Sequence, residues 1–284
     1  MIGQIVWSED DKTSEQKTYF ERYTGADAEK LGSETCLVCH DDKFPMKVQN
    51  HINLIDRDPD NSEFGFGCET CHGPGGMHNG DIDGILVPEK LTSKESADLC
   101  SKCHVKLGSY RKNAWLSSDH FYSDLDCFSC HQGHSTNRSF LIEKTITDTC
   151  IKCHLRQKLE FNQRSHHPVN DGLLSCSSCH NAMSGQFEHQ LVNEGDELCF
   201  KCHADKQGPF IFDMGIGTDV GGDGCRSCHI PHGSSTDSLL KYPRRLCLDC
   251  HSEMTDNAHF PGTCWQDGCH AEVMGSNSDP LFFE

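Results

Sequence analysis

Two cysteines three positions apart, followed at once by a histidine, recur along the whole of this chain. Nine copies have the form Cys-x-x-Cys-His, and a tenth has four residues between its cysteines. Together the ten copies use all 20 cysteines, so none is left for a disulfide bond or a catalytic thiol. The cysteine pairs are Cys36/Cys39, Cys68/Cys71, Cys100/Cys103, Cys127/Cys130, Cys150/Cys153, Cys176/Cys179, Cys199/Cys202, Cys225/Cys228, Cys247/Cys250 and Cys264/Cys269. The histidines that follow them are His40, His72, His104, His131, His154, His180, His203, His229, His251 and His270.

This pattern is the signature of covalent c-type haem attachment. Each thiol adds to one of two vinyl groups on the porphyrin, and the short loop between the cysteines sets the separation of the two sulfurs. The histidine is then held under the ring, where its imidazole becomes the proximal iron ligand. Zinc sites, redox dithiols and disulfide frameworks also use paired cysteines, but none of them requires a histidine after every second cysteine. The sequence therefore predicts ten haem c groups.

The composition indicates that these haems form the core. Leu, Ile, Val and Phe make up only about a fifth of the 284 residues, and the formal net charge is -18, which borders on a disordered composition. We therefore predict loops and short helices wrapped around an elongated row of ten haems, with little or no β structure. Helices are expected within Ser14–Tyr23, Ser93–His104 and Glu194–His203. The acidity argues against nucleic acid and favours basic redox partners.

The spacing of the motifs predicts an internal repeat. From Cys127 onward the motif starts follow one another at steps of 23, 26, 23, 26 and 22 residues, which gives two haems per 49 residues. Stacked two-haem units would form a quasi-linear row. We divide the chain into an N-terminal arm without a motif, residues 1–35, and a single elongated decahaem domain, residues 36–284. The arm is interpreted as a surface segment around the first haem, or alternatively as a docking segment for a partner.

Nine histidines remain once the ten proximal ones are assigned. They are His51, His78, His120, His134, His166, His167, His189, His232 and His259. Most stand at repeated offsets: some lie a few residues before a motif, as His120, His167 and His259 do, and others lie three residues after one, as His134 and His232 do. We predict that most of them are second axial ligands, and that His134 reaches a neighbouring haem.

The inter-motif residues resemble the decahaem cytochromes of the MtrA/DmsE type. The resemblance covers residues 36 to about 276, and it rests on the haem number, on the alternating motif pairs and on the segments Cys68–His78, Arg164–Pro168 and Cys228–Ser234. It implies a periplasmic-side cytochrome with bis-histidine haems in an elongated chain. In that family the protein commonly sits inside an outer-membrane porin and carries electrons across the membrane, which makes a porin and an outer-surface cytochrome the expected partners.

This chain departs from the family at three ligand positions, where Met183, Met214 and Met274 replace the usual histidine. Together with seven histidines at family positions, these methionines make ten distal ligands for ten haems. The seven are His51, His78, His120, His134, His167, His232 and His259. In the alternative interpretation, the methionines pack on the rings and His189 or His166 binds iron. The widened tenth motif is a further departure, which can tilt its haem.

The expected location is periplasmic, outer-membrane-associated or extracellular, because bacteria attach haem covalently outside the cytoplasmic membrane. No apolar run approaches the roughly 18–20 residues of a membrane-spanning helix. Residues Met1–Trp7 lack the basic region and the apolar length of a signal peptide. We interpret this as a processed or truncated form, or as an unusual start.

The expected function is electron transfer without a substrate. A multihaem reductase, acting for example on nitrite, hydroxylamine or sulfur oxyanions, needs an open iron site beside proton donors. Ten candidate distal ligands for ten haems argue against such a site. A subunit of an extracellular cytochrome filament is the other alternative, because the arm and the terminal haems would suit contacts between subunits.

Overall fold

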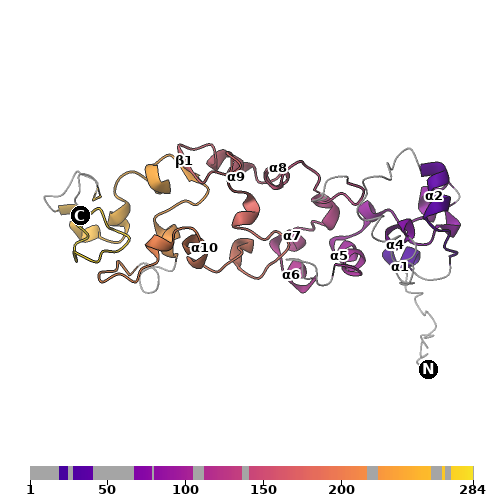
Figure 1. Cartoon of the computed structure of the whole chain (residues 1–284), viewed down its shortest axis with the longest axis horizontal. Coiled ribbons are helices and arrows are strands. Elements are labelled where there is room, and N and C mark those ends of the chain that lie inside the picture. The colour runs from indigo at the N-terminus through magenta and orange to yellow at the C-terminus, as the bar shows by residue number, and fades with distance from the viewer. Residues whose placement is uncertain are drawn as a thin grey trace, which may run out of the picture. The chain divides into compact units, whose positions relative to one another are not determined.

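The computed structural model describes residues 19–24, 28–40, 67–78, 80–104, 112–135, 141–215, 223–256, 264–265 and 270–283. The chain divides into two compact units: unit 1 comprises residues 1–100 and 126–140, and unit 2 comprises residues 101–125 and 141–284. Short helices joined by irregular segments make up the described parts of both units (Figure 1). The predicted fold class, an irregular multihaem cytochrome chain with short helices and little sheet, is therefore confirmed.

The longest of these helices has nine residues. The α-helices are α1 (Tyr19–Thr24), α2 (Ser33–His40), α4 (Cys68–His72), α5 (Ser93–Ser101), α6 (Lys112–Leu116), α7 (Asp119–Tyr122), α8 (Ile146–Ile151), α9 (Leu155–Glu160) and α10 (Glu197–Phe200). Two-residue strands, β1 (Ser165–His166) and β2 (Gly233–Ser234), pair antiparallel in unit 2. Among the described residues, no helix has the length and apolar character that crossing a membrane requires.

Two kinds of local structure alternate at the motifs from the third to the eighth. Cys100 and Cys150 lie near the ends of α5 and α8, and Cys199 lies in α10. The motifs between them and after them start in tight 3-10 turns, which are Cys127–Ser129, Cys176–Ser178 and Gly224–Ser227. Among the motifs of the first kind, α8 has a polar N-cap, because the Thr145 hydroxyl accepts a hydrogen bond from the Asp148 amide.

The apolar core of unit 1 is small and is completed by α1. Leu86, Leu91 and Leu99 are buried together, and Tyr19, Phe20 and Tyr23 of α1 pack against them. The Tyr19 hydroxyl accepts from the Val87 amide at 3.0 Å. The three aromatic residues lie on one face of the helix, as the spacing of Ser14–Tyr23 predicted, and this face packs against the rest of unit 1.

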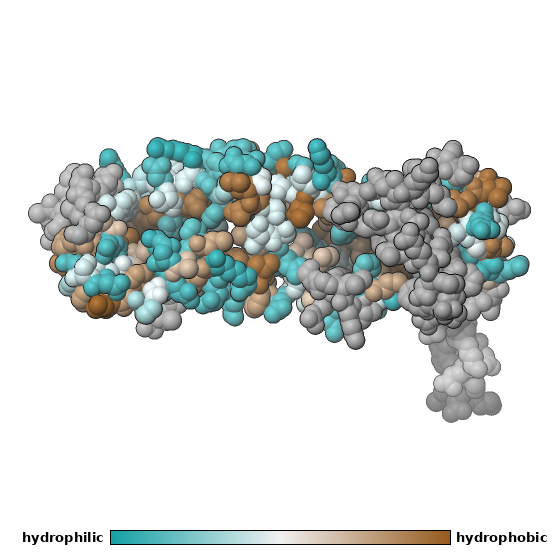
Figure 2. All heavy atoms as spheres, in the orientation of Figure 1, coloured by the Kyte–Doolittle hydropathy of each residue, from teal (hydrophilic) through white to brown (hydrophobic). Residues whose placement is uncertain are grey.

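Few apolar side chains are buried in the described parts of the chain. They are Leu86, Leu91, Ala97 and Leu99 in unit 1, and Trp115, Phe161, Val169 and Leu246 in unit 2. On the face drawn in Figure 2, small apolar groups are scattered among hydrophilic residues. The polypeptide thus contributes little hydrophobic core of its own.

A buried carboxylate joins the first two motifs. The side chain of Glu69, inside the second motif, is only 5% exposed. Its two oxygens accept hydrogen bonds from the backbone amides of Leu31 and Gly32, both at 2.9 Å, and of Gly75 at 2.8 Å. Glu69 therefore fixes the segment that leads into α2 against α4.

Replacing this carboxylate should release the segment. In Glu69→Ala one buried amide, that of Gly75, and the two part-buried amides of Leu31 and Gly32 lose a charged acceptor, which costs on the order of 3 kcal/mol. Hydrogen exchange of the Leu31, Gly32 and Gly75 amides should then accelerate by about 100-fold. Glu34→Ala, in the first turn of α2, is the matched control. Unchanged protection of the three amides in Glu69→Ala would show that Glu69 does not anchor the segment.

The 49-residue repeat predicted from the motif spacing is visible in unit 2. His180 and Leu191 form an isolated antiparallel bridge, and His229 and Leu240, each 49 residues later, form the same bridge. The His189 carbonyl lies 2.9 Å from His180 Nδ1, and the Ser238 carbonyl lies 2.7 Å from His229 Nδ1. Both carbonyl-bearing residues have left-handed backbone angles, with φ of 55° and 58°. The two copies therefore place their proximal histidines in the same way.

Candidate haem-binding sites

Each motif from the fourth to the ninth forms one tight turn that carries its histidine back over its first cysteine. The histidine amide donates to the carbonyl of the first cysteine of its motif at 2.9–3.0 Å in six consecutive motifs, which are those of His131, His154, His180, His203, His229 and His251. The widened tenth motif keeps the same bond, from the His270 amide to the Cys264 carbonyl, at 3.1 Å. The two additional residues therefore do not displace the histidine from its place beside the first cysteine. Cys269 itself lies outside the described residues.

The second cysteine of a motif is in most copies more exposed than the first. Every first cysteine is half-buried. Three of the second cysteines that the structure describes are half-buried, and each of them follows one of the three 3-10 turns given above. They are Cys130, Cys179 and Cys228. The remaining ones are exposed: Cys39, Cys71, Cys103, Cys153, Cys202 and Cys250. Cys250 also follows a 3-10 turn, Leu246–Asp249, so the kind of turn does not alone decide the exposure.

The motif pattern gives no reason to distinguish the two thiols of a motif, but in the structure most pairs differ in solvent exposure. The described cysteines form no disulfide bonds with one another. The exposed thiols, such as those of Cys39, Cys153 and Cys250, are accessible to a vinyl group, whereas Cys130 is partly covered by the polypeptide. A thioether bond at each of these second cysteines stays a prediction.

Five proximal histidines lie opposite a second histidine at the spacing of two ligands on one metal. A metal–imidazole bond of about 2.0 Å puts a ring centre roughly 3 Å from the metal, so two trans imidazoles have centres about 6 Å apart. The observed separations are 6.3 Å for His40/His78, 5.8 Å for His72/His134, 6.0 Å for His120/His154, 6.1 Å for His180/His232 and 6.2 Å for His167/His203. These residues fit bis-histidine haem.

The other nitrogen of these rings is held by a hydrogen bond in several of the pairs. His72, His78, His120, His167 and His180 each have Nδ1 at 2.5–3.1 Å from a backbone carbonyl oxygen, supplied by Leu86, Asp81, Ala182, Pro231 and His189 respectively. A carbonyl only accepts, so each Nδ1 carries the proton. Nε2 is then the nitrogen available to a metal, as in other ligating histidines.

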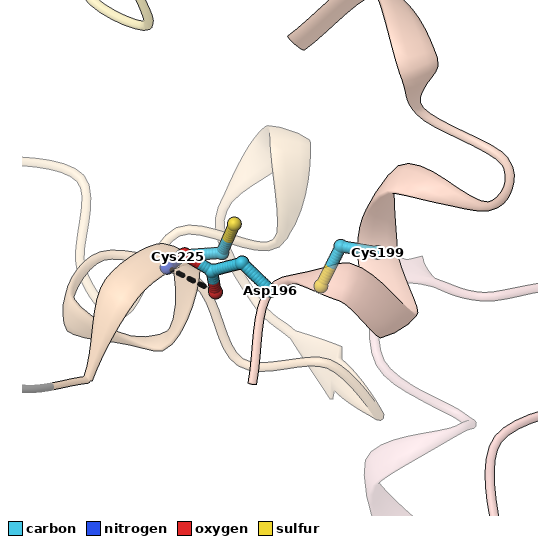
Figure 3. Close-up of side chains that lie close together, drawn as sticks. All are labelled: Asp196, Cys199 and Cys225. Atoms are coloured by element: carbon cyan, nitrogen blue, oxygen red, sulfur yellow. Dashed lines mark hydrogen bonds between the residues drawn. The ribbon is translucent and has the colours of Figure 1, made fainter. Parts of the chain in front are cut away.

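Thiols of successive motifs lie against one another. Five pairs of first cysteines are close enough for a thiol–thiol hydrogen bond: Cys36/Cys68, Cys100/Cys127, Cys150/Cys176, Cys199/Cys225 and Cys247/Cys264. In one of them, ligand atoms of Asp196, Cys199 and Cys225 all lie within 4.8 Å of one another. Figure 3 shows this group and the hydrogen bond from the Cys225 amide to the Asp196 carboxylate, at 2.9 Å. Because both cysteines belong to haem motifs, the group is part of two attachment sites.

Hydrogen bonds between thiols and burial shift the pKa values of the thiols in opposite directions. A hydrogen bond from Cys100 lowers the pKa of Cys127 to about 7, and one from Cys150 lowers the pKa of Cys176 to about 6. Burial raises the pKa of Cys225 to about 12. Burial also lowers the pKa of the His154 and His180 imidazoles. It favours the neutral ring, which is the form that binds a metal.

The three methionines at ligand positions are half-buried. Met214 and Met274 belong to segments that pair: Phe212 and Ser276 form an antiparallel bridge, and each methionine stands two residues from it. Of the alternative ligands, His189 offers its carbonyl to His180, and its own Nε2 lies 3.5 Å from Glu188. His166 has Nδ1 at 2.8 Å from the Gln163 carbonyl. His51 and His259 lie outside the described residues.

Comparison with known proteins identifies related sequences over most of the chain. A family model described as a doubled CXXCH motif matches residues 120–159, 166–208 and 218–256, and one described as cytochrome c554 and c-prime matches residues 6–73. A protein named multiheme cytochrome MtrA, from Shewanella baltica (strain OS185), is 31% identical over 231 residues. The alignment covers 78% of this chain and 53% of that protein, so the chain spans about half the length of the curated relative that it matches.

Proposed function

Because the chain belongs to the MtrA-like multihaem c-type cytochromes, we propose that it conducts electrons along a row of ten covalently attached haems. Electrons would pass from periplasmic donors across the outer membrane or to it. Haem supplies a one-electron iron couple, whose potential is set by its axial ligands and its surroundings. The protein's part is to hold the groups in sequence and to keep both axial positions of each iron filled.

The single observation that carries this proposal is the contact between thiols of successive motifs. In unit 1 the thiol of Cys36 meets that of Cys68, and the Cys100 thiol meets that of Cys127 and is influenced by Cys71. In unit 2 the same first-to-first contacts recur, and the thiols of Cys179 and Cys228 are electrostatically influenced by thiols of the motifs that follow them. Because the thiols fix the porphyrin edges, these contacts bring the edges of neighbouring groups together, as a conductor requires.

We assign the axial ligands as follows. All 20 motif cysteines form thioether bonds, and the ten motif histidines are proximal ligands. The ring spacing supports His78, His120, His134, His167 and His232 as distal ligands, for the motifs of His40, His154, His72, His203 and His180 respectively. Hydrogen bonds at Nδ1 add support for all of these except His134. His51, His259, Met183, Met214 and Met274 supply the other five.

The proposed partners are redox proteins outside the cytoplasmic membrane. The net charge of -18 favours basic contact surfaces on a donor or an acceptor. By its relation to MtrA, the chain is proposed to work in the periplasm in association with an outer-membrane porin and an outer-surface cytochrome. A filament would instead require contacts between copies of this chain.

Carbon monoxide tests the closed-iron prediction. The reduced holoprotein should bind little carbon monoxide on the timescale of mixing, because two protein ligands occupy each iron, and it should show no turnover of nitrite, hydroxylamine or sulfite. His232→Ala, which opens one iron, is the positive control and should add one rapid binding site. Rapid binding by most haems in the wild-type protein would favour a reductase, and a mass that grows with concentration in sedimentation would favour a filament.

A further inference from the structure

Of the four distal histidines for which the Nδ1 partner is established, one differs from the other three. In His78, His120 and His167 this nitrogen bonds to a neutral backbone carbonyl, as described above. In His232 it lies 2.9 Å from Oε2 of the Glu160 carboxylate. The two side chains are 30% and 19% exposed, so the pair is largely shielded from water. The proximal ring opposite, His180, has an ordinary carbonyl partner.

Three features of the fold hold this pair in place. β1 begins five residues after Glu160, β2 begins directly after His232, and the two strands pair with Ser165 opposite Ser234 and His166 opposite Gly233. A Cβ at Gly233 would collide with the Glu160 carbonyl oxygen, so the backbones approach closely at this point because the residue is glycine. The buried Phe161 ring lies edge-on to His232, with ring centres 5.4 Å apart. The contact is therefore fixed by packing and by backbone pairing.

We propose that Glu160 is a positioning residue that lowers the reduction potential of the haem held between His180 and His232. This inference rests on the proposed ligand role of His232. A carboxylate that accepts the Nδ1 proton draws that proton away from the ring and leaves Nε2 a stronger electron donor. A stronger axial donor stabilises ferric iron relative to ferrous iron. This haem should therefore be harder to reduce than haems whose distal rings bond to carbonyls.

Arg156 opposes this effect only weakly. Its Nε donates to the other Glu160 oxygen at 2.8 Å, one helical turn earlier in α9. The Arg156 side chain is 84% exposed, so water screens its charge. The carboxylate therefore keeps most of its effect on His232. Without Arg156 this effect should increase.

The test is Glu160→Gln, which keeps the shape and an acceptor oxygen for Nδ1 but removes the charge. Reduction of one haem should become about tenfold more favourable, a positive shift of about 59 mV in its potential. The near-infrared magnetic circular dichroism band of the same haem, whose energy follows axial donor strength, should move to lower energy. Glu188→Gln is the matched control, because Glu188 neighbours the residue that supplies the carbonyl to His180 and does not contact a distal ligand.

Three outcomes decide between the possibilities. The inference holds if Glu160→Gln shifts the potential and the band more than Glu188→Gln does, and if Arg156→Gln shifts the potential in the negative direction. It is overturned if Glu160→Gln and Glu188→Gln behave alike, or if Arg156→Gln raises the potential. His232→Ala tests the ligand role of His232 separately from the effect of Glu160 on the potential. The appearance of one high-spin haem supports ligation by His232, whereas an unchanged low-spin spectrum would remove the ligand assignment on which the inference depends.

Discussion

A chain in which alanine replaces every motif cysteine is expected to give the circular dichroism of a disordered polypeptide. Ordering the backbone costs about 1–2 kcal/mol per residue, and burial must offset that cost. The four largest fully buried side chains in the described parts of the chain are Leu86, Ser96, Ser118 and Ser276, and three of these are serines. Leu155, Leu159 and Leu173 are more than half exposed, so they contribute little burial to the polypeptide alone.

Two controls make this test specific. The wild-type holoprotein should have an intact mass of the polypeptide plus ten haems and should keep its helical signal. The double substitution Cys199→Ala and Cys202→Ala removes one attachment site, so one haem should be lost while most of the helical signal remains. A cooperative thermal transition in the chain without motif cysteines would show that side chains alone can form the fold.

The motifs and the fold class could be predicted from the sequence because both follow from local chemistry. Each motif from the fourth to the ninth is one turn, in which the histidine amide returns to the carbonyl of the first cysteine. The helix predicted within Glu194–His203 is shorter than expected, since α10 covers only Glu197–Phe200. Asp196 stands at its N-cap, but its carboxylate accepts from the Cys225 amide and does not cap the helix. A long-range competitor of this kind leaves no trace in local sequence.

The neighbours of each motif could not be predicted from the repeat. Sequence similarity groups Cys127 with Cys150 and Cys176 with Cys199, and the doubled-motif matches follow the same grouping. The first-cysteine contacts instead join Cys150 to Cys176 and Cys199 to Cys225. A repeat tells which residues are equivalent, but the residues that meet depend on how consecutive copies fold back on one another.

Most partners of the ligand histidines were also beyond prediction, because they are backbone carbonyls. Any residue can supply a carbonyl, so Ala182, Pro231 and Leu86 carry no signature of this role. For His189 the side chain suggested a role in the site, whereas the contact is made by its backbone carbonyl. Its imidazole suggested a ligand, but the repeat places it where the next copy has Ser238, and both residues offer a carbonyl from a left-handed backbone.

The methionines at ligand positions are expected to make the haems electrochemically unequal. A thioether is a weaker donor than imidazole, so His/Met ligation favours ferrous iron and raises the potential relative to bis-histidine ligation. Axial ligand identity can move haem potentials over a range on the order of 0.8 V. Haems bound by Met183, Met214 and Met274 should therefore be reduced first. At equilibrium, electrons should rest at these haems.

The observed pairings suggest which iron two of these methionines serve. His232, three residues after the eighth motif, lies opposite His180 of the sixth. By the same rule Met274, shortly after the tenth motif, is expected to serve the haem of His229 in the eighth. His167, before the sixth motif, lies opposite His203 of the seventh, so Met214, before the eighth, is expected to serve the haem of His251 in the ninth.

Magnetic circular dichroism of the oxidised protein in the near infrared should show His/Met bands beside bis-histidine bands. Met214→His and Met274→His should each convert one His/Met band into a bis-histidine band and lower one potential, because imidazole is the stronger donor. Met254→Leu is the control: Met254 lies three residues after His251 and is 49% exposed, where other motifs of its kind carry Gln157 and Lys206. A wild-type spectrum with bis-histidine bands alone would overturn methionine ligation. Met183, Met214 and Met274 would then be packing residues, a role that their soft side chains also suit.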